Sequence, residues 1–291
     1  MFWILIGITI LGFAIQAVLT SHIVRQMDTL SGSMYRSISL IFIMLPLLLL
    51  SDMETISQIG NYQAQLIPAA IAGALATWFS YSAVKKLPMG ISASLKTITS
   101  VLGALMLGWM FFQEYFNIYA IVSIIVMLVW GVIISNTKTR FDHLDNDNLF
   151  LWILYSFIAG FLWAVTVFFL VQVSRDLWPY VAGYFWEVEI AIALILMVLV
   201  RKIFFNWKIE KISKAQFGKI AIAASPTLPA TWAMAVAGTV WPFAIISVML
   251  TFIIVVITIL GTLFFKEKLD RLQYLGIIII CIWALGVRMF G

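Results

Sequence analysis

The sequence predicts an all-α integral membrane protein in which ten transmembrane helices form a 5+5 inverted repeat. Three observations predict this fold: the composition, the spacing of apolar segments and an internal repeat. Of the 291 residues, 63% are hydrophobic and only 11% are charged, and the mean hydropathy is +1.06. An ordinary soluble domain carries about 25% charged residues. A water-soluble fold of this length could not bury so much apolar surface, so the chain is expected to reside in a bilayer.

Ten apolar segments follow one another along the chain. A spanning helix needs roughly 20 mostly apolar residues, and the predicted cores are 2–20, 30–50, 64–84, 90–112, 117–135, 149–172, 179–200, 217–236, 241–265 and 271–290. The longest polar connections, 136–148 and 201–216, are too short for a soluble domain. The chain therefore divides into an N-terminal five-helix repeat, 1–140, and a C-terminal five-helix inverted repeat, 141–291, within one membrane domain.

The internal repeat can be recognised from matching residues in the two halves of the sequence. Phe111–Trp130 and Phe264–Trp283 each contain two Phe, a Glu two residues on, a polar patch and an apolar run ending in Trp. Further matches occur in the same order at an offset of about 150 residues: Ala76-Thr77-Trp78 with Ala230-Thr231-Trp232, Pro88 with Pro242, and Gly12-Phe13 with Gly160-Phe161. Five is an odd number, so the second copy enters the membrane from the opposite side. Inverted repeats are common in secondary transporters, which bind substrate between the halves near the midplane.

Basic residues predict the orientation. The loops and loop borders after odd-numbered helices hold Arg25, Lys85, Lys86, Lys138, Arg140, Arg201, Lys202, Lys208, Lys211, Lys214, Lys219, Lys266, Lys268 and Arg271. The opposite side has only Arg175 and Arg288. The positive-inside rule then places the odd loops in the cytoplasm and both termini on the external face of the cell (inner or plasma) membrane.

Several of these features also occur together in a known family. The five-plus-five repeat, Arg36 in Met34-Tyr35-Arg36-Ser37, the stretch LPMGISASL, the Glu of FFQE and FFKE, and Trp163 in Phe161-Leu162-Trp163-Ala164 resemble the EamA-like branch of the drug/metabolite transporter superfamily. The resemblance implies a central cavity lined by helices 1 to 4 and 6 to 9, with helices 5 and 10 at the periphery. It also implies transport of amino acids, nucleotide sugars or other metabolites. The first helix has Ile15 or Gln16 where the sixth has Trp163, so the two cavity walls differ chemically.

Four ionisable residues lie within predicted spanning helices, where a charge costs about 2.5–3.5 kcal/mol on insertion scales. Arg36 and Lys96 either extend to the cytoplasmic interface or attract an anionic group at the inner mouth of the cavity. Glu187 and Glu189 are about 200° apart around a helix, so they cannot both face one cavity squarely. Each is a candidate for proton coupling or for the counter-charge to a substrate amine. The alternative is a structural bond to a neighbouring helix or to Arg36.

Aromatic and hydroxyl side chains inside the helices provide further candidates for substrate binding. The aromatic candidates are Trp78, Tyr81, Trp163 and Trp232. Their rings could hold an amine by cation–π attraction or stack on a ring; the alternative is helix packing. Hydroxyls accompany them at Thr77, Ser80, Ser82, Thr227 and Thr231. Pro226 and Pro229 interrupt backbone hydrogen bonding in the eighth predicted helix, where a bend could serve gating or be static.

The function predicted from these observations is secondary transport. The sequence has no phosphate-binding loop, zinc motif or nucleophile elbow, so no enzyme activity, ATP hydrolysis, metal or other cofactor is expected. The protein is predicted to be a monomer whose two repeats form an internal pseudo-dimer. No nucleic-acid partner is expected. The predicted protein moves a small polar solute, amino acid-like or otherwise zwitterionic or amphoteric, by alternating access, through proton coupling or exchange. The alternatives are a lipid flippase, a channel and a membrane-embedded enzyme.

Overall fold

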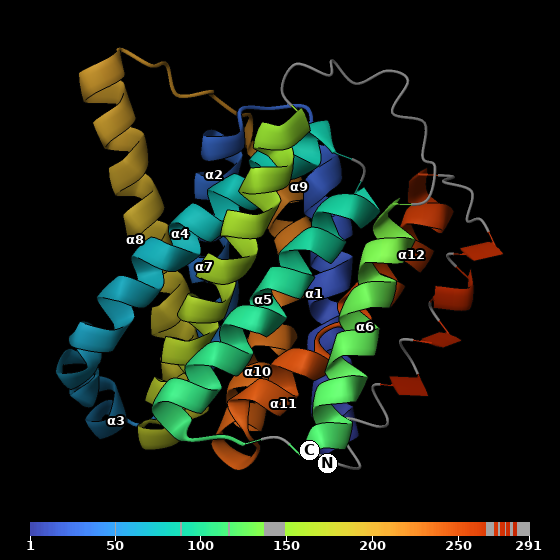
Figure 1. Cartoon of the computed structure of the whole chain (residues 1–291). Helices are drawn as coiled ribbons and strands as arrows, with labels where there is room; N and C mark the ends of the chain where they lie inside the picture. The colour runs from blue at the N-terminus through green and yellow to red at the C-terminus, as the bar shows by residue number, and fades with distance from the viewer. Residues whose placement is uncertain are drawn as a thin grey trace.

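Every element that the computed structural model describes is a helix (Figure 1). The described residues are 1–49, 51–87, 89–115, 117–136, 149–265 and, within 271–283, all but 273, 277, 280 and 281. Six helical stretches among them are long and apolar enough to cross a membrane. These findings confirm an all-helical, multi-pass membrane protein, whereas the count of ten spanning helices stays a prediction.

The first half of the chain follows the predicted cores closely. Its long helices are α1 (Phe2–Val24), α2 (Thr29–Leu49), α4 (Gln63–Lys86), α5 (Met89–Phe112) and α6 (Ile118–Asn136). Between α2 and α4 the chain forms two short elements that were not predicted, α3 (Met53–Ser57) and the 3₁₀ helix η1 (Gln58–Tyr62). Asp52 begins α3 by accepting a hydrogen bond from the Thr55 backbone N–H at 2.6 Å, the standard N-cap interaction.

The second half contains two breaks inside predicted helices. Its elements are α7 (Leu149–Asp176), α8 (Pro179–Phe205), α9 (Lys214–Ala224), α10 (Thr227–Val240), α11 (Phe243–Met249) and α12 (Phe252–Phe265). The core predicted at 217–236 is divided between α9 and α10 beside Pro226, which has no backbone N–H. The core predicted at 241–265 is divided at Leu250–Thr251, where neither Pro nor Gly marks the break. The core predicted at 271–290 lies partly outside the described residues.

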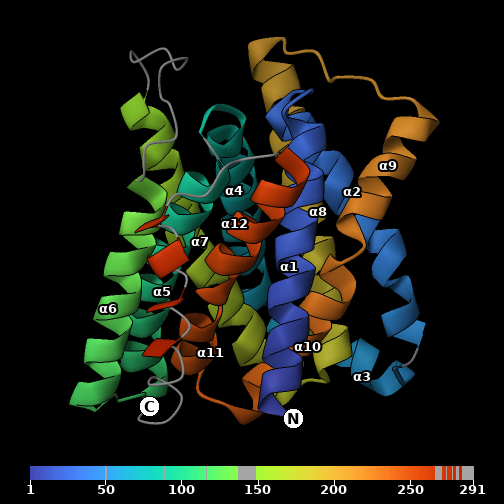
Figure 2. The same ribbon diagram turned by 90° about the vertical axis from the view of Figure 1, so that its right-hand side faces the viewer.

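The long helices run up and down through one bundle (Figures 1 and 2). The most extensive contacts join α7 to α4 and α5, α1 to α10, and α2 to α8. Small residues permit close approach, as is usual in membranes. A methyl group on Gly73 of α4 would lie 2.6 Å from Ile190 of α8, and one on Gly12 of α1 would lie 2.6 Å from the Pro226 carbonyl oxygen. α6 lies at one side of the bundle against α5 (Figure 2), and it exposes Ile118, Ile121, Val122, Ile125 and Val129.

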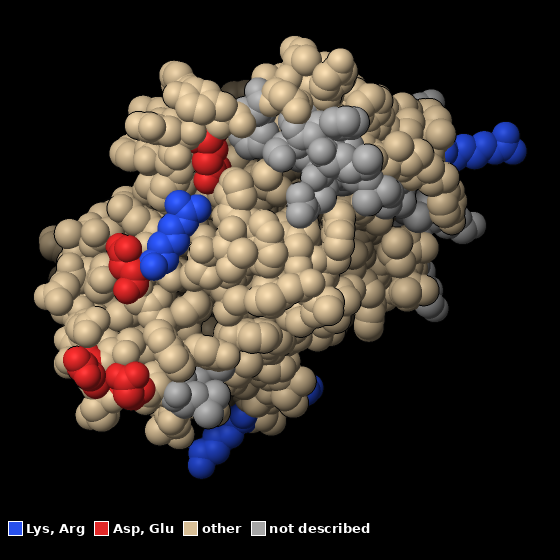
Figure 3. Space-filling model, turned by 90° about the horizontal axis from the view of Figure 1, so that it is seen from below, with Lys and Arg blue, Asp and Glu red and all other residues tan. Residues whose placement is uncertain are grey.

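Charged side chains differ between the two ends of the bundle. The end seen in Figure 3, near the N-terminus, is largely uncharged, with a few scattered acidic and basic side chains. The opposite end carries the basic residues that border α1, α4, α8 and α9: Arg25, Lys85, Lys86, Arg201, Lys202, Lys208, Lys211 and Lys214. We call these the plain end and the basic end.

Candidate functional site

A cavity of about 130 Å³ opens between α1, α4, α5, α7 and α12. The residues that line it come from the last part of α1 and α4 and the first part of α5, so the cavity lies in the half of the bundle toward the basic end. Its polar and aromatic lining includes Gln16, Ser21, Arg36, Thr77, Ser80, Tyr81, Ser92, Lys96, Thr97, Ser100, Trp163 and Ser247. Among the eight site residues predicted from sequence, Arg36, Tyr81, Lys96 and Trp163 line this cavity.

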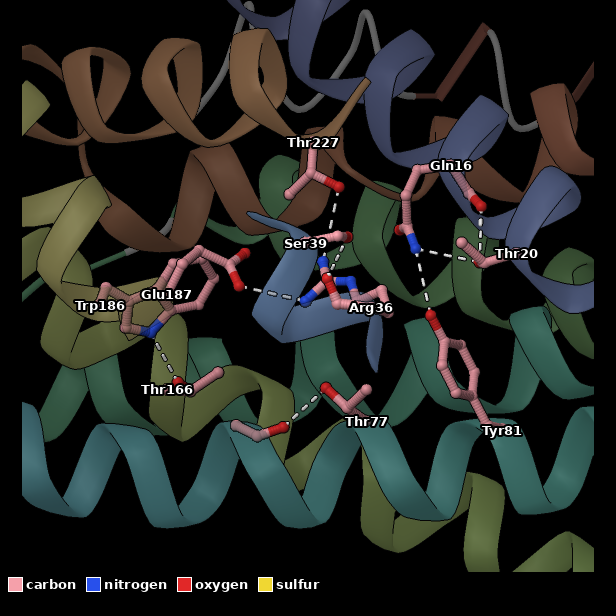
Figure 4. Close-up of polar contacts among 11 residues, drawn as sticks. Gln16, Thr20, Arg36, Ser39, Thr77, Tyr81, Thr166, Trp186, Glu187 and Thr227 are labelled. Carbon is pink, nitrogen blue, oxygen red and sulfur yellow. Dashed lines mark hydrogen bonds and ion pairs between the residues drawn. The ribbon is translucent and has the colours of Figure 1, made fainter. Parts of the chain in front are cut away.

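Arg36 of α2 forms a buried ion pair with Glu187 of α8 (Figure 4). Arg36 Nη1 lies 3.1 Å from Glu187 Oε2, and the two side chains are 6% and 1% exposed. Arg36 Nη2 also donates to Thr227 Oγ1 at 3.5 Å. The remaining guanidinium nitrogen, Nε, is buried and has no hydrogen-bond partner within the described part of the chain. The structural bond between Glu187 and Arg36, one of the alternatives considered from sequence, is therefore present.

Lys96 of α5 lies over the indole ring of Trp163 of α7. Its Nζ is 4.6 Å from the ring centroid, which is cation–π geometry. Phe13 and Trp186 meet the same indole edge-on, at centroid distances of 5.8 Å and 5.9 Å. Trp186 is itself held by Thr166, whose Oγ1 accepts from the indole N–H at 2.8 Å (Figure 4). This packing fixes the ring on which the lysine rests.

An amide and a phenol join α1 to α4 on another wall of the cavity. Gln16 Nε2 donates to Tyr81 OH at 3.3 Å and to Thr20 Oγ1 at 3.0 Å (Figure 4). Sequence analysis proposed Tyr81 as a binding residue but gave Gln16 no role of its own. The available signal was the amide group of Gln16 within an otherwise apolar helix.

Three of the predicted residues lie elsewhere, and the fourth acts from behind the cavity wall. Trp78 stacks on Phe79 at 5.1 Å and is not part of the cavity lining. Trp232 stacks on Tyr180 at 6.0 Å in the other half of the bundle. Glu189 is half-buried, lines no part of the cavity and forms no ion pair within the described part of the chain. Glu187 contributes to the site only through Arg36.

Toward the plain end, the segment that matches the cavity wall in the sequence repeat is buried. Thr231, the repeat counterpart of the cavity residue Thr77, is completely buried. Its hydroxyl and the Trp232 indole N–H are buried, and neither has a hydrogen-bond partner among the residues that the structure describes. Buried donors of this kind are unusual in folded proteins. The two halves thus present matching segments in unlike environments, one facing a cavity and one packed shut.

Glu114 forms hydrogen bonds with the first residues of α11 at the plain end. Its carboxylate oxygens accept hydrogen bonds from the Phe243 and Ala244 backbone N–H groups, each at 2.8 Å. Arg175 Nη2 lies 3.7 Å from the same carboxylate, and Arg175 Nε donates to the Gly238 carbonyl at 3.0 Å. The Glu of the FFQE joint therefore ties α5, α7, α10 and α11 together at this end.

The apolar helices and the polar cavity between them are those of a multi-pass membrane protein that can hold a small solute. Residues 1–137 match the EamA-like transporter family, and this match confirms the resemblance to the EamA-like branch of the drug/metabolite transporter superfamily. Members of that family are transporters rather than enzymes.

The fold as a whole also has counterparts among solved structures. One crystal structure of a protein aligns with a TM-score of 0.69 over 97% of this chain and 96% of that chain, at 14% sequence identity. At this identity the likeness shows the fold alone. No curated protein sequence matches the chain significantly.

Proposed function

We propose that this protein is a secondary transporter that binds a small polar metabolite in the cavity and moves it across the cell membrane by alternating access. The observation that carries the proposal is the cavity itself, which places charged, hydroxyl and aromatic groups inside an apolar bundle. At about 130 Å³ it is far larger than the roughly 10–15 Å³ that a single water molecule needs. This is the scale of a small metabolite, such as an amino acid or another amphoteric solute, rather than of a lipid.

The helix contacts support an inverted repeat with a pseudo-two-fold axis in the membrane plane. In such an arrangement α4 corresponds to α9–α10, α7 to α1, and α5 to α11–α12. The contact of α4 with α7 then has its counterpart in that of α10 with α1, and the contact of α5 with α7 in that of α12 with α1. Arg25 and Arg175 also correspond: each donates through Nε to a carbonyl at the end of a helix, Val84 for the first and Gly238 for the second.

Two pseudo-symmetric halves can exchange conformations, and the exchange moves the opening from one face of the membrane to the other. The cavity lies toward the basic end, which the positive-inside rule assigns to the cytoplasm. We therefore propose that this structure represents the inward-facing state of a monomer with both termini outside. Coupling would occur by exchange or by proton transfer through Glu187 or Glu189.

The test is flux in proteoliposomes. Metabolite pools are first screened against the purified protein by thermal stability, because a ligand that binds only the folded state raises the apparent Tm. Stabilising metabolites are then assayed for uptake at two pH values, with and without the same solute inside. We expect saturable uptake that internal solute stimulates. Ion currents far above turnover rates would instead show a channel, and lipid scrambling would show a flippase.

The role of Glu187 is tested in the same assay. If Glu187 carries the coupling proton, Glu187→Gln abolishes the pH dependence of uptake by the fraction of the protein that inserts and elutes as a single species, although the variant is less stable than the wild type. Unchanged pH dependence would remove Glu187 from the coupling mechanism.

A further inference from the structure

The charges around the cavity do not balance. Among the described residues, its lining contains two cations, Arg36 and Lys96, and no carboxylate. Glu187 neutralises Arg36 from behind the lining. Lys96 forms no ion pair with any described residue and rests only on the Trp163 ring. The described residues of the cavity walls therefore carry one uncompensated positive charge.

The same walls have unused hydrogen-bond donors. Arg36 Nε and Ser80 Oγ are buried and have no hydrogen-bond partner among the described residues. Both residues line the cavity. The Lys96 ammonium adds three N–H donors. Leaving a buried donor unpaired costs free energy, and it costs more when the donor is charged. An oxygen-rich anion entering the cavity would pair with the Lys96 ammonium, because hydrogen bonds between ionised groups are the strong ones.

We propose that the cavity selects an organic monoanion whose carboxylate is held by Lys96. One bound carboxylate brings the net charge of the site to zero. The aromatic faces of Trp163 and Phe13 beside Lys96 accommodate the rest of the solute. A zwitterion binds more weakly, because its ammonium finds no carboxylate on the lining. The claim that the protein transports such an anion rests on the proposed function and replaces the amphoteric solute named there by an anion. The claim that the cavity binds the anion does not depend on transport.

The test compares solutes that differ by one charge. Purified protein is titrated with lactate and lactamide, with N-acetylalanine and its amide, and with zwitterionic alanine, and thermal stability is followed. We expect at least one carboxylate to raise the apparent Tm and its matched amide to leave it unchanged. Lys96→Gln should weaken the apparent affinity for that carboxylate at least tenfold, whereas Lys96→Arg, which keeps the charge, should retain most of it. Lys202→Gln is the control, since Lys202 is exposed at the end of α8.

Three results would overturn the proposal. The first is stabilisation by an amide or by alanine that equals that by the carboxylates. The second is an equal carboxylate response in the wild type and in a folded Lys96→Gln protein. The third is the absence of a response to every carboxylate.

Flux separates this proposal from the proposed function. If an anion binds in a Lys96-dependent way but no bound anion is transported, the proposed transport is contradicted and the proposed anion site is supported. If a neutral solute is transported and Lys96→Gln does not change its flux, the proposed anion site is contradicted and the proposed transport is supported.

Discussion

Replacing one partner of the Arg36–Glu187 pair should destabilise the protein severely. The charged atoms are 3.1 Å apart, and both side chains are almost fully buried. Glu187→Gln leaves the guanidinium without its counter-charge, and Arg36→Gln leaves a bare carboxylate inside the bundle. Removing one partner of a buried pair typically costs about 3–5 kcal/mol. The double variant removes both charges together, so we expect it to be no less stable than either single variant.

The assay is equilibrium unfolding in mixed detergent micelles, followed by the fluorescence of the twelve tryptophans. Independent effects would add to about 6–10 kcal/mol in the double variant, so a clear shortfall from that sum measures the coupling. Arg201→Gln serves as the matched control, because Arg201 lies 3.8 Å from Asp28 in an ion pair whose side chains are 38% and 26% exposed. An exposed pair is worth about 0–1 kcal/mol. The reasoning is refuted if the single variants lose no more stability than Arg201→Gln, or if the double variant loses the full sum.

Two further predictions concern the packing of the bundle and are measured by the same unfolding assay. Gly160→Ala should lose about 1–3 kcal/mol, because a methyl group there would overlap the backbone of Lys96 and the Thr99 hydroxyl. Gly7→Ala is its control: no atom lies within 4 Å of the added methyl, so stability should stay level or rise by up to about 1 kcal/mol. Equal effects at the two glycines would contradict the close helix approach. Glu114→Gln should lose about 1–2 kcal/mol, because an amide cannot accept both backbone hydrogen bonds that start α11; unchanged stability would show that this contact is dispensable.

The elements best predicted from sequence were the long helices, because their length is dictated by the bilayer. An apolar run of bilayer length forms a helix, because each backbone N–H and C=O group in the bilayer must be hydrogen-bonded within the protein. The break at Leu250–Thr251 carries no Pro or Gly, so nothing in the local sequence distinguishes it. The short elements α3 and η1 lie in a polar segment, where the same bilayer argument does not operate.

Only part of the candidate site could be predicted from the sequence, because the bilayer also makes buried charges costly. Burial cost singled out Arg36, Lys96 and Glu187 as functional candidates, but the partner of each depends on how distant helices pack. Arg36 and Glu187 are far apart in sequence and meet only because α2 lies against α8. Trp78 shows the converse limit: its helix lines the cavity, but its ring stacks on Phe79 instead.

The most direct test of alternating access uses the repeat counterparts Thr77 and Thr231. Each is replaced by cysteine in a Cys281→Ser background, which removes the single native cysteine, and is labelled with an impermeant maleimide from either face of oriented proteoliposomes. In the resting protein, position 77 should react only from the basic end and position 231 should be protected. During turnover, position 231 should become reactive from the plain end as position 77 becomes less reactive. Simultaneous labelling of both positions, or protection of position 231 under every condition, would contradict the account.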